Sequence, residues 1–219
     1  MIQQPTTIIA PSLLGADLSD TRAGLSDIEK SGASWIHIDI MDGHFVPSLG
    51  FSPQVVRDIR PKTNLFLDIH LMTQNPQNYV DVLSEGGADC ITFHIEACTH
   101  AHRLAKQIRK SGREVGIALV PSTPIAAIEE MLPEVDQVLV MSVNPGFANE
   151  DFLDSSPKRI AALARRRAEG GHRFRIAIDG GIARTNARSV IKAGADVVVV
   201  GRSFFAAPDK IDEVAGLLA

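Results

Sequence analysis

The sequence has few of the features that mark secreted, membrane-bound or nucleic-acid-binding proteins. It contains two cysteines, Cys90 and Cys98, in 219 residues, too few for a scaffold held together by disulfides. No apolar run approaches the roughly 18 residues that a membrane span needs, and the first residues do not resemble a secretory leader. The formal net charge of −4 gives no basic excess that would favour nucleic acid or an anionic membrane. We therefore expect a cytoplasmic protein without nucleic-acid or membrane partners.

Several catalytic motifs are also missing. No G-x-G-x-x-G turn follows the first predicted strand, which argues against a doubly wound dinucleotide-binding sheet. The lysines lie in predicted helices or loops, so none is placed at a strand end to form a Schiff base. The chain has neither an Asp-x-Lys-x-x-Asp decarboxylase motif nor a nucleophile elbow for a Ser-His-Asp triad.

Short apolar runs alternate with amphipathic segments along the chain. The runs predict strands at residues 6–12, 35–40, 65–72, 90–95, 115–120, 137–143, 174–179 and 196–201. The amphipathic segments predict helices at residues 18–32, 75–87, 99–112, 123–132, 156–171 and 185–195. Strands that alternate with helices require right-handed crossovers and a parallel sheet. Eight such units predict one (β/α)8 TIM barrel, a single domain over residues 1–219.

Ionisable side chains interrupt three of the predicted strands. His37 and Asp39 are two residues apart on the second strand, so they point to the same face. Asp68 and His70 have the same relation on the third strand, and the seventh strand ends at Asp179. Because the eighth strand closes onto the first, these strands face one another across the barrel mouth. Imidazoles and carboxylates in one small space predict a site for one divalent metal ion, Zn²⁺, Fe²⁺, Mn²⁺ or Co²⁺.

Some of these polar residues have a second interpretation. Any one of the four predicted ligands (His37, Asp39, His70 and Asp179), taken alone, could be a polar group satisfied by its neighbours. Their convergence favours the metal site. Asp68 lies one pleat deeper than His70 and is expected to orient its neighbours. Asp42 is expected to be a turn residue or a partner of a metal ligand. His94 and Glu96, after the fourth strand, could support the site or serve the fold alone.

Glycine-containing loops follow the last three predicted strands. Gly180 and Gly181 follow the seventh strand and Gly201 follows the eighth, which predicts a phosphate site built from backbone N–H groups. The loop that contains Gly146 predicts a cover over the barrel mouth, although an ordinary surface loop has a similar composition. Methionines at strand ends could fill the core or line a pocket that keeps water from the metal: Met41, Met72 and Met141.

A metal beside two carboxylates, with a phosphate anchor, suits removal of a proton next to the carbonyl group of a phosphosugar. The metal stabilises the charge that develops in the transition state. Asp39 and Asp179 lie on strands across the mouth from each other, so one can take a proton and the other can return one. If they act on opposite faces of a planar intermediate, the stereocentre inverts.

Seven motifs occur in an order that resembles the ribulose-phosphate 3-epimerase family across nearly the whole chain. They are APSLL, HIDIMDGHFVP, DIHLM, TFHIEA, VNPGF, DGGI and VVGRSFF. The resemblance implies a metal-dependent interconversion of D-ribulose 5-phosphate and D-xylulose 5-phosphate in pentose phosphate metabolism. It also implies a phosphosugar as the small-molecule partner. We further expect a homo-oligomer, with no prediction of the number of subunits.

The resemblance also implies a role for individual residues. The implied metal ligands are His37, Asp39, His70 and Asp179. Asp39 would be the proton acceptor and Asp179 the proton donor, and these roles would exchange in the reverse direction. The implied contacts to the phosphosugar come from Ser12, His70, Gly146, Phe147, Ala148, Asn149, Gly180, Gly181, Gly201 and Arg202.

Three stretches depart from the family's usual pattern. The cover loop reads NPGFANE in place of NPGFGGQ, so that Ala148, Asn149 and Glu150 replace two glycines and a glutamine. Arg202 stands where a small residue is common, and it could bind phosphate or point outward. HFVPSLGFSP replaces HFVPNLTIGP.

These departures keep two alternatives open. One is a 3-epimerase of another ketose phosphate, such as D-allulose 6-phosphate or a tetrulose phosphate. The other is a catalytically silent barrel that binds metal or phosphosugar. The intact pair of acid–base carboxylates argues against the silent barrel, since binding alone does not need them.

Overall fold

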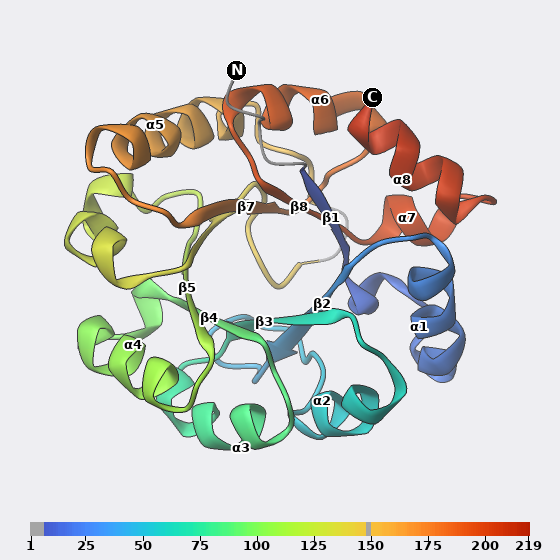
Figure 1. Cartoon of the computed structure of the whole chain (residues 1–219), viewed down its shortest axis with the longest axis horizontal. Helices are drawn as coiled ribbons and strands as arrows, with labels where there is room; N and C mark the ends of the chain where they lie inside the picture. The colour runs from blue at the N-terminus through green and yellow to red at the C-terminus, as the bar shows by residue number, and fades with distance from the viewer. Residues whose placement is uncertain (1–6, 148–149) are drawn as a thin grey trace.

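Eight parallel strands curl around one axis to form a barrel (Figure 1). The computed structural model describes residues 7–147 and 150–219 of the chain. The strands are β1 (Ile8–Pro11), β2 (Trp35–Met41), β3 (Phe66–Met72), β4 (Cys90–His94), β5 (Glu114–Leu119), β6 (Gln137–Met141), β7 (Arg175–Asp179) and β8 (Val197–Val200). β8 pairs with β1, and a parallel bridge between Ser12 and His37 brings β1 and β2 together. The predicted (β/α)8 TIM barrel is confirmed.

Helices form a ring around the strands (Figure 1). The α-helices are α1 (Thr21–Lys30), α2 (Gln54–Ile59), α3 (Val80–Glu85), α4 (Ala101–Lys110), α5 (Ser156–Glu169), α6 (Arg184–Ala193), α7 (Arg202–Ala206) and α8 (Lys210–Leu218). The 3-10 helices are η1 (Leu13–Gly15), η2 (Leu18–Asp20), η3 (Arg60–Lys62), η4 (Pro76–Asn78), η5 (Ile95–Ala97) and η6 (Ile125–Glu134). Across the part of the chain that the structure describes, no helix is long and apolar enough to cross a membrane.

The segment after β5 differs from its prediction. The sequence pattern predicts a helix at residues 123–132, and the structure has the 3-10 helix η6 there, with Pro133 inside it. Proline has no N–H for the helical ladder, and its ring clashes with the carbonyl group four residues earlier. The apolar periodicity therefore gave the position of this element but not its hydrogen-bonding pattern.

The two faces of each strand have different environments. On β2, Ile36, Ile38 and Ile40 pack in the main core, which includes residues of the surrounding helices. The alternate residues of β2, which include His37 and Asp39, point into the barrel interior. The register pairs His37 with Asp68 and Asp39 with His70 on β3. Adjacent strands thus carry their ionisable side chains at the same height.

Aromatic and charged side chains close the amino end of the barrel. The rings of Trp35 and Phe66 stack with their centroids 4.0 Å apart. The guanidinium carbon of Arg175 lies 5.0 Å from the Trp35 ring centroid, and the guanidinium group also pairs with Glu114. Above them, interior residues such as Leu139 are fully buried. The ionisable side chains therefore lie above a filled layer, towards the carboxyl end of the strands.

The interior is packed tightly at Gly116 on β5. A Cβ atom there would lie 2.0 Å from Thr92 Oγ1 and 2.7 Å from Thr92 Cβ. We predict that Gly116→Ala lowers the free energy of unfolding by ~1–3 kcal/mol, because the methyl group must displace Thr92. The matched control is Gly112→Asn, at a left-handed position where a Cβ would meet no atom within 4 Å. Urea unfolding compares the variants, and equal effects would contradict the prediction.

Candidate active site

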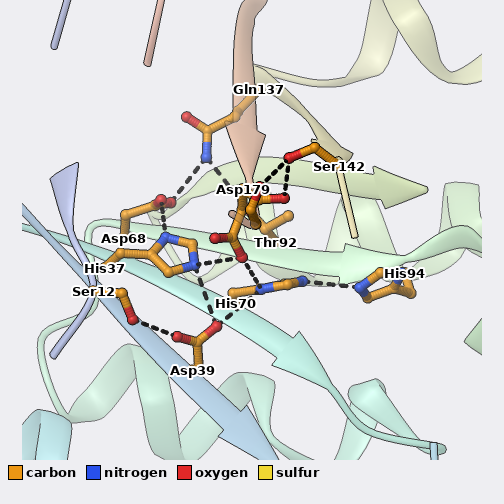
Figure 2. A network of polar contacts seen from close by, with 11 residues as sticks. Ser12, His37, Asp39, Asp68, His70, Thr92, His94, Gln137, Ser142 and Asp179 are labelled. Carbon is orange, nitrogen blue, oxygen red and sulfur yellow. Dashed lines mark hydrogen bonds and ion pairs between the residues drawn. The ribbon is translucent and has the colours of Figure 1, made fainter. Parts of the chain in front are cut away.

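Two histidines and two aspartates form a cluster near the carboxyl ends of β2, β3 and β7 (Figure 2). β2 supplies His37 and Asp39, β3 supplies His70, and β7 supplies Asp179. One possible ligand atom from each of the four side chains lies within 4.8 Å of the other three. Both histidines are fully buried, and 18% of the Asp179 side chain is exposed. The structure thus brings together the four residues predicted as metal ligands.

The two ring nitrogens of His37 have different surroundings. Nδ1–H donates to Asp68 Oδ2 at 2.8 Å, because a carboxylate can only accept. Nε2 is buried and has no hydrogen-bond partner among the described residues. It lies 3.4 Å from Asp39 Oδ1 and 3.9 Å from Asp179 Oδ2. A lone pair facing two carboxylate oxygens is unfavourable unless a proton or a cation lies between them.

The side chains of the cluster therefore fit a divalent metal ion. Two imidazoles and two carboxylates are a donor set that suits Zn²⁺ and its first-row neighbours. The orphaned Nε2 of His37 points at the carboxylates and would supply its lone pair to a bound ion. Its Nδ1–H bond to Asp68 is the support that ligating histidines commonly have, since it fixes the ring and its tautomer.

The two aspartates of the cluster hold protons with different strength. Burial, reinforced by repulsion from Asp39, raises the pKa of Asp179 to about 7. Burial also acts on Asp39, but His37 and His70 favour its ionised form and hold its pKa well below the usual range. Burial lowers the pKa of His70 to about 4. Carboxyl groups whose environments separate their pKa values are typical of an acid and a base that act together.

Residues behind His37 belong to the same network. Asp68 is fully buried, and its Oδ1 accepts a hydrogen bond from Gln137 Nε2 at 2.9 Å. The Gln137 amide also lies 3.4 Å from Thr92 Oγ1 (Figure 2). Asp68 orients His37, as the sequence suggested. Sequence analysis missed Gln137 and Thr92, because a single polar residue in an apolar strand does not reveal its partner across the barrel.

A cavity of about 790 Å³ opens above the cluster. Its lining includes Ser12, Asp39, Met41, Met72, Met141, Gly146, Phe147, Glu150, Asp179, Gly180, Gly181, Gly201 and Arg202. Ser12 Oγ donates to Asp39 Oδ2 at 2.6 Å. The predicted substrate contacts Ala148 and Asn149 lie outside the described residues.

The loops after β7 and β8 meet at this cavity. Gly180 and Gly181 have φ angles of +115° and +65°, which favour glycine. Ser203 Oγ donates to the carbonyl oxygen of Ile182 at 2.8 Å and joins the two loops. Gly201 and Arg202 line the same cavity. The predicted phosphate-binding loops therefore lie together, and Arg202 reaches the cavity wall.

The loop after β6 is held against the loop after β2. Ser48 Oγ donates to the carbonyl oxygen of Gly146 at 2.5 Å. A Cβ atom on Gly146 would lie 2.3 Å from Val46 Cβ, so the two backbones approach closely. Phe147 and Leu49 at this edge of the cavity are 58% and 77% exposed. Gly146 and Phe147 therefore lie at the edge of the cavity.

Asp42 serves a turn. Its Oδ1 accepts from the backbone N–H groups of His44 and Phe45 at 2.9 and 3.0 Å, and its Oδ2 accepts from that of Gln74 at 2.8 Å. The side chain therefore joins the loops that follow β2 and β3. Of the two expectations for Asp42, the structure supports the turn residue.

We predict that Asp42 makes stability depend on pH. Burial acts to raise the pKa of Asp42, but three backbone N–H donors lower it overall. A depressed pKa contributes stability above the unfolded value of about 4, and this contribution is lost as the pH falls through the folded value. Asp42→Asn, which turns an amide donor towards the Gln74 N–H, should lower the free energy of unfolding at pH 7 by ~1 kcal/mol.

Urea unfolding from pH 7 to pH 2.5 checks this prediction. The difference between wild type and Asp42→Asn should shrink below about pH 4. The matched control is Asp81→Asn on the exposed side of α3, which should leave the free energy of unfolding unchanged. A difference that is constant with pH would contradict the assignment.

Known structures with the same fold differ widely in sequence. The tryptophan synthase A-subunit of the hyperthermophile Pyrococcus furiosus is 19% identical, with a TM-score of 0.69 over 100% of this chain and 99% of that one. Orotidine 5'-phosphate decarboxylase from Pyrococcus horikoshii OT3 is 17% identical, with a TM-score of 0.69 over 96% of this chain and 97% of that one. At these identities the similarity shows the barrel fold alone.

Sequence comparison is more specific. The model of the ribulose-phosphate 3 epimerase family matches residues 8–205. The ribulose-phosphate 3-epimerase of Treponema pallidum (strain Nichols) is 49% identical over 90% of this chain and 90% of that protein. The ribulose-phosphate 3-epimerase of Bacillus subtilis (strain 168) is 40% identical over 95% of this chain and 98% of that protein. The chain therefore belongs to the ribulose-phosphate 3-epimerase family, and it is an enzyme of the isomerase class.

Proposed function

We propose that this protein inverts C3 of D-ribulose 5-phosphate to give D-xylulose 5-phosphate, a reaction of pentose phosphate metabolism, and that it needs one divalent metal ion. The observation that carries the proposal is the pair Asp39 and Asp179. The two carboxyl groups come from non-neighbouring strands, differ in proton affinity and line one cavity. An epimerase that uses two bases needs such a pair, whereas a binding protein does not.

The proposed metal ligands are His37, Asp39, His70 and Asp179. When bound, the ion would act as a Lewis acid that favours negative charge on the substrate oxygens next to C3. The choice among Zn²⁺, Fe²⁺, Mn²⁺ and Co²⁺ is not fixed by this donor set, since imidazole and carboxylate suit all four.

Asp39 and Asp179 exchange protons with the substrate. Asp39 is the ionised member of the pair and removes the C3 proton, while the Ser12 hydroxyl holds its Oδ2. The resulting enediolate is planar at C3 and has lost the configuration of the substrate. Asp179, which has the higher pKa of the two in the metal-free site, returns a proton to the opposite face. In the reverse direction the two roles exchange.

The rest of the cavity would bind and cover the phosphosugar. The phosphate group would take backbone N–H groups of Gly180, Gly181 and Gly201, with the Arg202 guanidinium as a charged donor. Met41, Met72 and Met141 line the cavity with thioether groups and limit the access of water. Gly146 and Phe147, with Ala148 and Asn149, would complete the cover over the sugar.

A second candidate substrate is another ketose phosphate, such as D-allulose 6-phosphate or a tetrulose phosphate. Two residues that depart from the usual family motifs, Glu150 and Arg202, line the cavity. At these positions they would contact the substrate and could discriminate between ketose phosphates of different length and hydroxyl configuration. The acid–base pair would act on C3 of such a substrate in the same way.

We predict that C3 exchanges with solvent during turnover. With D-ribulose 5-phosphate in D₂O, deuterium should enter C3 as D-xylulose 5-phosphate forms, and NMR follows both changes. A chelator should slow the reaction and an added divalent metal should restore it. Asp179→Asn should lower kcat ~10²–10⁴-fold, because it removes the proton donor.

The same variants separate the roles of the two aspartates. Asp179→Asn should still exchange the C3 proton of D-ribulose 5-phosphate without forming the epimer, whereas Asp39→Asn should do neither. Asp81→Asn serves as the control and should keep full activity. A folded, metal-loaded wild type that exchanges nothing would refute the pentulose assignment. Exchange with D-allulose 6-phosphate or a tetrulose phosphate in its place would establish the second candidate.

We predict that Arg202 contributes to phosphate affinity. Arg202→Ala should raise KM ~10–100-fold with kcat nearly unchanged, because a charge-assisted contact present throughout the reaction is lost. Arg188→Ala, an exposed arginine on α6, is the control and should change neither constant. An unchanged KM for Arg202→Ala would mean that its guanidinium points away from the substrate.

A further inference from the structure

Polar contacts connect His70 to a side chain near the protein surface. His70 Nε2 lies 2.9 Å from His94 Nε2 (Figure 2). On the other side of its ring, His94 Nδ1 lies 3.2 Å from Glu96 Oε2. The side chains of His70 and His94 are fully buried, while 23% of the Glu96 side chain is exposed. The chemistry proposed above uses neither His94 nor Glu96.

The carboxylate at the end of this chain decides where the ring protons lie. An ionised carboxylate accepts hydrogen bonds and cannot donate one, so a neutral His94 beside Glu96 carries its proton on Nδ1 and accepts through Nε2. The matching tautomer of His70 donates through Nε2–H and keeps a lone pair on Nδ1. It competes with the tautomer whose Nδ1–H donates to Asp39.

The other ring nitrogen of His70 faces the metal cluster, within hydrogen-bond distance of Asp39. Nδ1 lies 3.1 Å from Asp39 Oδ1 and 3.7 Å from Asp179 Oδ2. This arrangement matches that of His37, whose Nε2 faces the same two carboxylates because Asp68 holds the proton on Nδ1. Both histidines thus direct one ring nitrogen at the same point. Asp68 holds His37 from behind, and Glu96 holds His70 through His94.

We propose that Glu96 is a positioning residue, which acts through His94 to hold His70 in the tautomer that can ligate a metal ion. The inference rests on the metal site in the proposed function and names the residue that prepares one of its ligands. Glu96 touches neither the proposed metal position nor the cavity above it. Its effect on His70 passes through one buried imidazole.

The surroundings of Glu96 keep it available for this role. Burial acts to raise the pKa of Glu96, but hydrogen bonds from His94, Thr123 and the Val120 N–H lower it to about 2. The Val120 N–H donates to Glu96 Oε1 at 2.9 Å and leaves Oε2 for His94. The ring of Phe45 packs on His94 with centroids 4.7 Å apart, which limits rotation of the imidazole.

A purely structural role for Glu96 would be to hold the loop after β5. Arg159 holds the same loop through hydrogen bonds of its own. Its guanidinium donates to the carbonyl oxygens of Val120, Pro121 and Thr123 at 3.0, 2.8 and 2.8 Å. Arg159→Ala therefore loosens this loop without removing the contact between Glu96 and His94, and it is the matched control for Glu96→Ala.

The first measurement is the affinity for Zn²⁺, by competition with a chromophoric chelator. Glu96→Ala should bind Zn²⁺ ~10–100-fold more weakly than wild type, the usual cost of removing the support of a ligating histidine. Glu96→Gln should recover part of this loss, because its amide oxygen can still accept from His94. Arg159→Ala should bind Zn²⁺ as wild type does.

The second measurement is the tautomer of His70, read from ¹⁵N shifts of the histidine rings in the metal-free protein. We expect Nε2–H in wild type and in Arg159→Ala, and a shift towards Nδ1–H in Glu96→Ala, where Asp39 can attract the proton. If wild type binds Zn²⁺ and Glu96→Ala has the same affinity and tautomer, the inference is wrong and the metal site stands. If wild type binds no divalent metal, the metal site fails and the inference fails with it.

Discussion

Three carboxyl groups, on Asp39, Asp68 and Asp179, project into the interior of a barrel where little solvent can reach them. Buried charges are tolerated when each has a partner of opposite charge or donors of hydrogen bonds. The arrangement of the site follows from this constraint. Asp68 is satisfied by His37 and Gln137, and Ser12 satisfies part of Asp39. The negative charge that remains without a full partner lies between Asp39, Asp179 and the two imidazoles, where a cation would fit.

The parallel ladder between β2 and β3 makes this compensation possible. Because the strands pair without offset, each histidine of one strand lies beside an aspartate of the other. Each imidazole can therefore use one nitrogen for the cluster and the other for a support in the barrel wall. A side chain held in this way is already oriented towards the position where an ion would bind. The fold supplies the rigidity, and four inward-facing positions on two strands supply most of the chemistry.

The sequence predicted those parts of the site that depend on local periodicity. His37 and Asp39 are recognisable because alternate residues of a strand share a face, and Asp179 because it ends an apolar run before two glycines. Gln137 acts through a contact with a residue far away in sequence, and no local pattern reveals such a contact. His94 and Glu96 were noticed in the sequence, but the contact of His94 with His70 on another strand was not predicted. The barrel itself followed from the alternation of strands and helices. The 3-10 form of η6 did not, because apolar spacing does not distinguish hydrogen bonds to the third residue from those to the fourth.

The filled amino end of the barrel affects how substrate enters and product leaves. Among the described residues, Trp35, Phe66 and Arg175 fill that end, and the reaction cavity lies at the carboxyl ends of the strands. Substrate and product, which differ at one stereocentre, therefore use the same opening of the cavity. Each departing product therefore occupies the route of the next substrate. Product that leaves slowly therefore competes with the entering substrate, and a high product concentration slows the forward reaction.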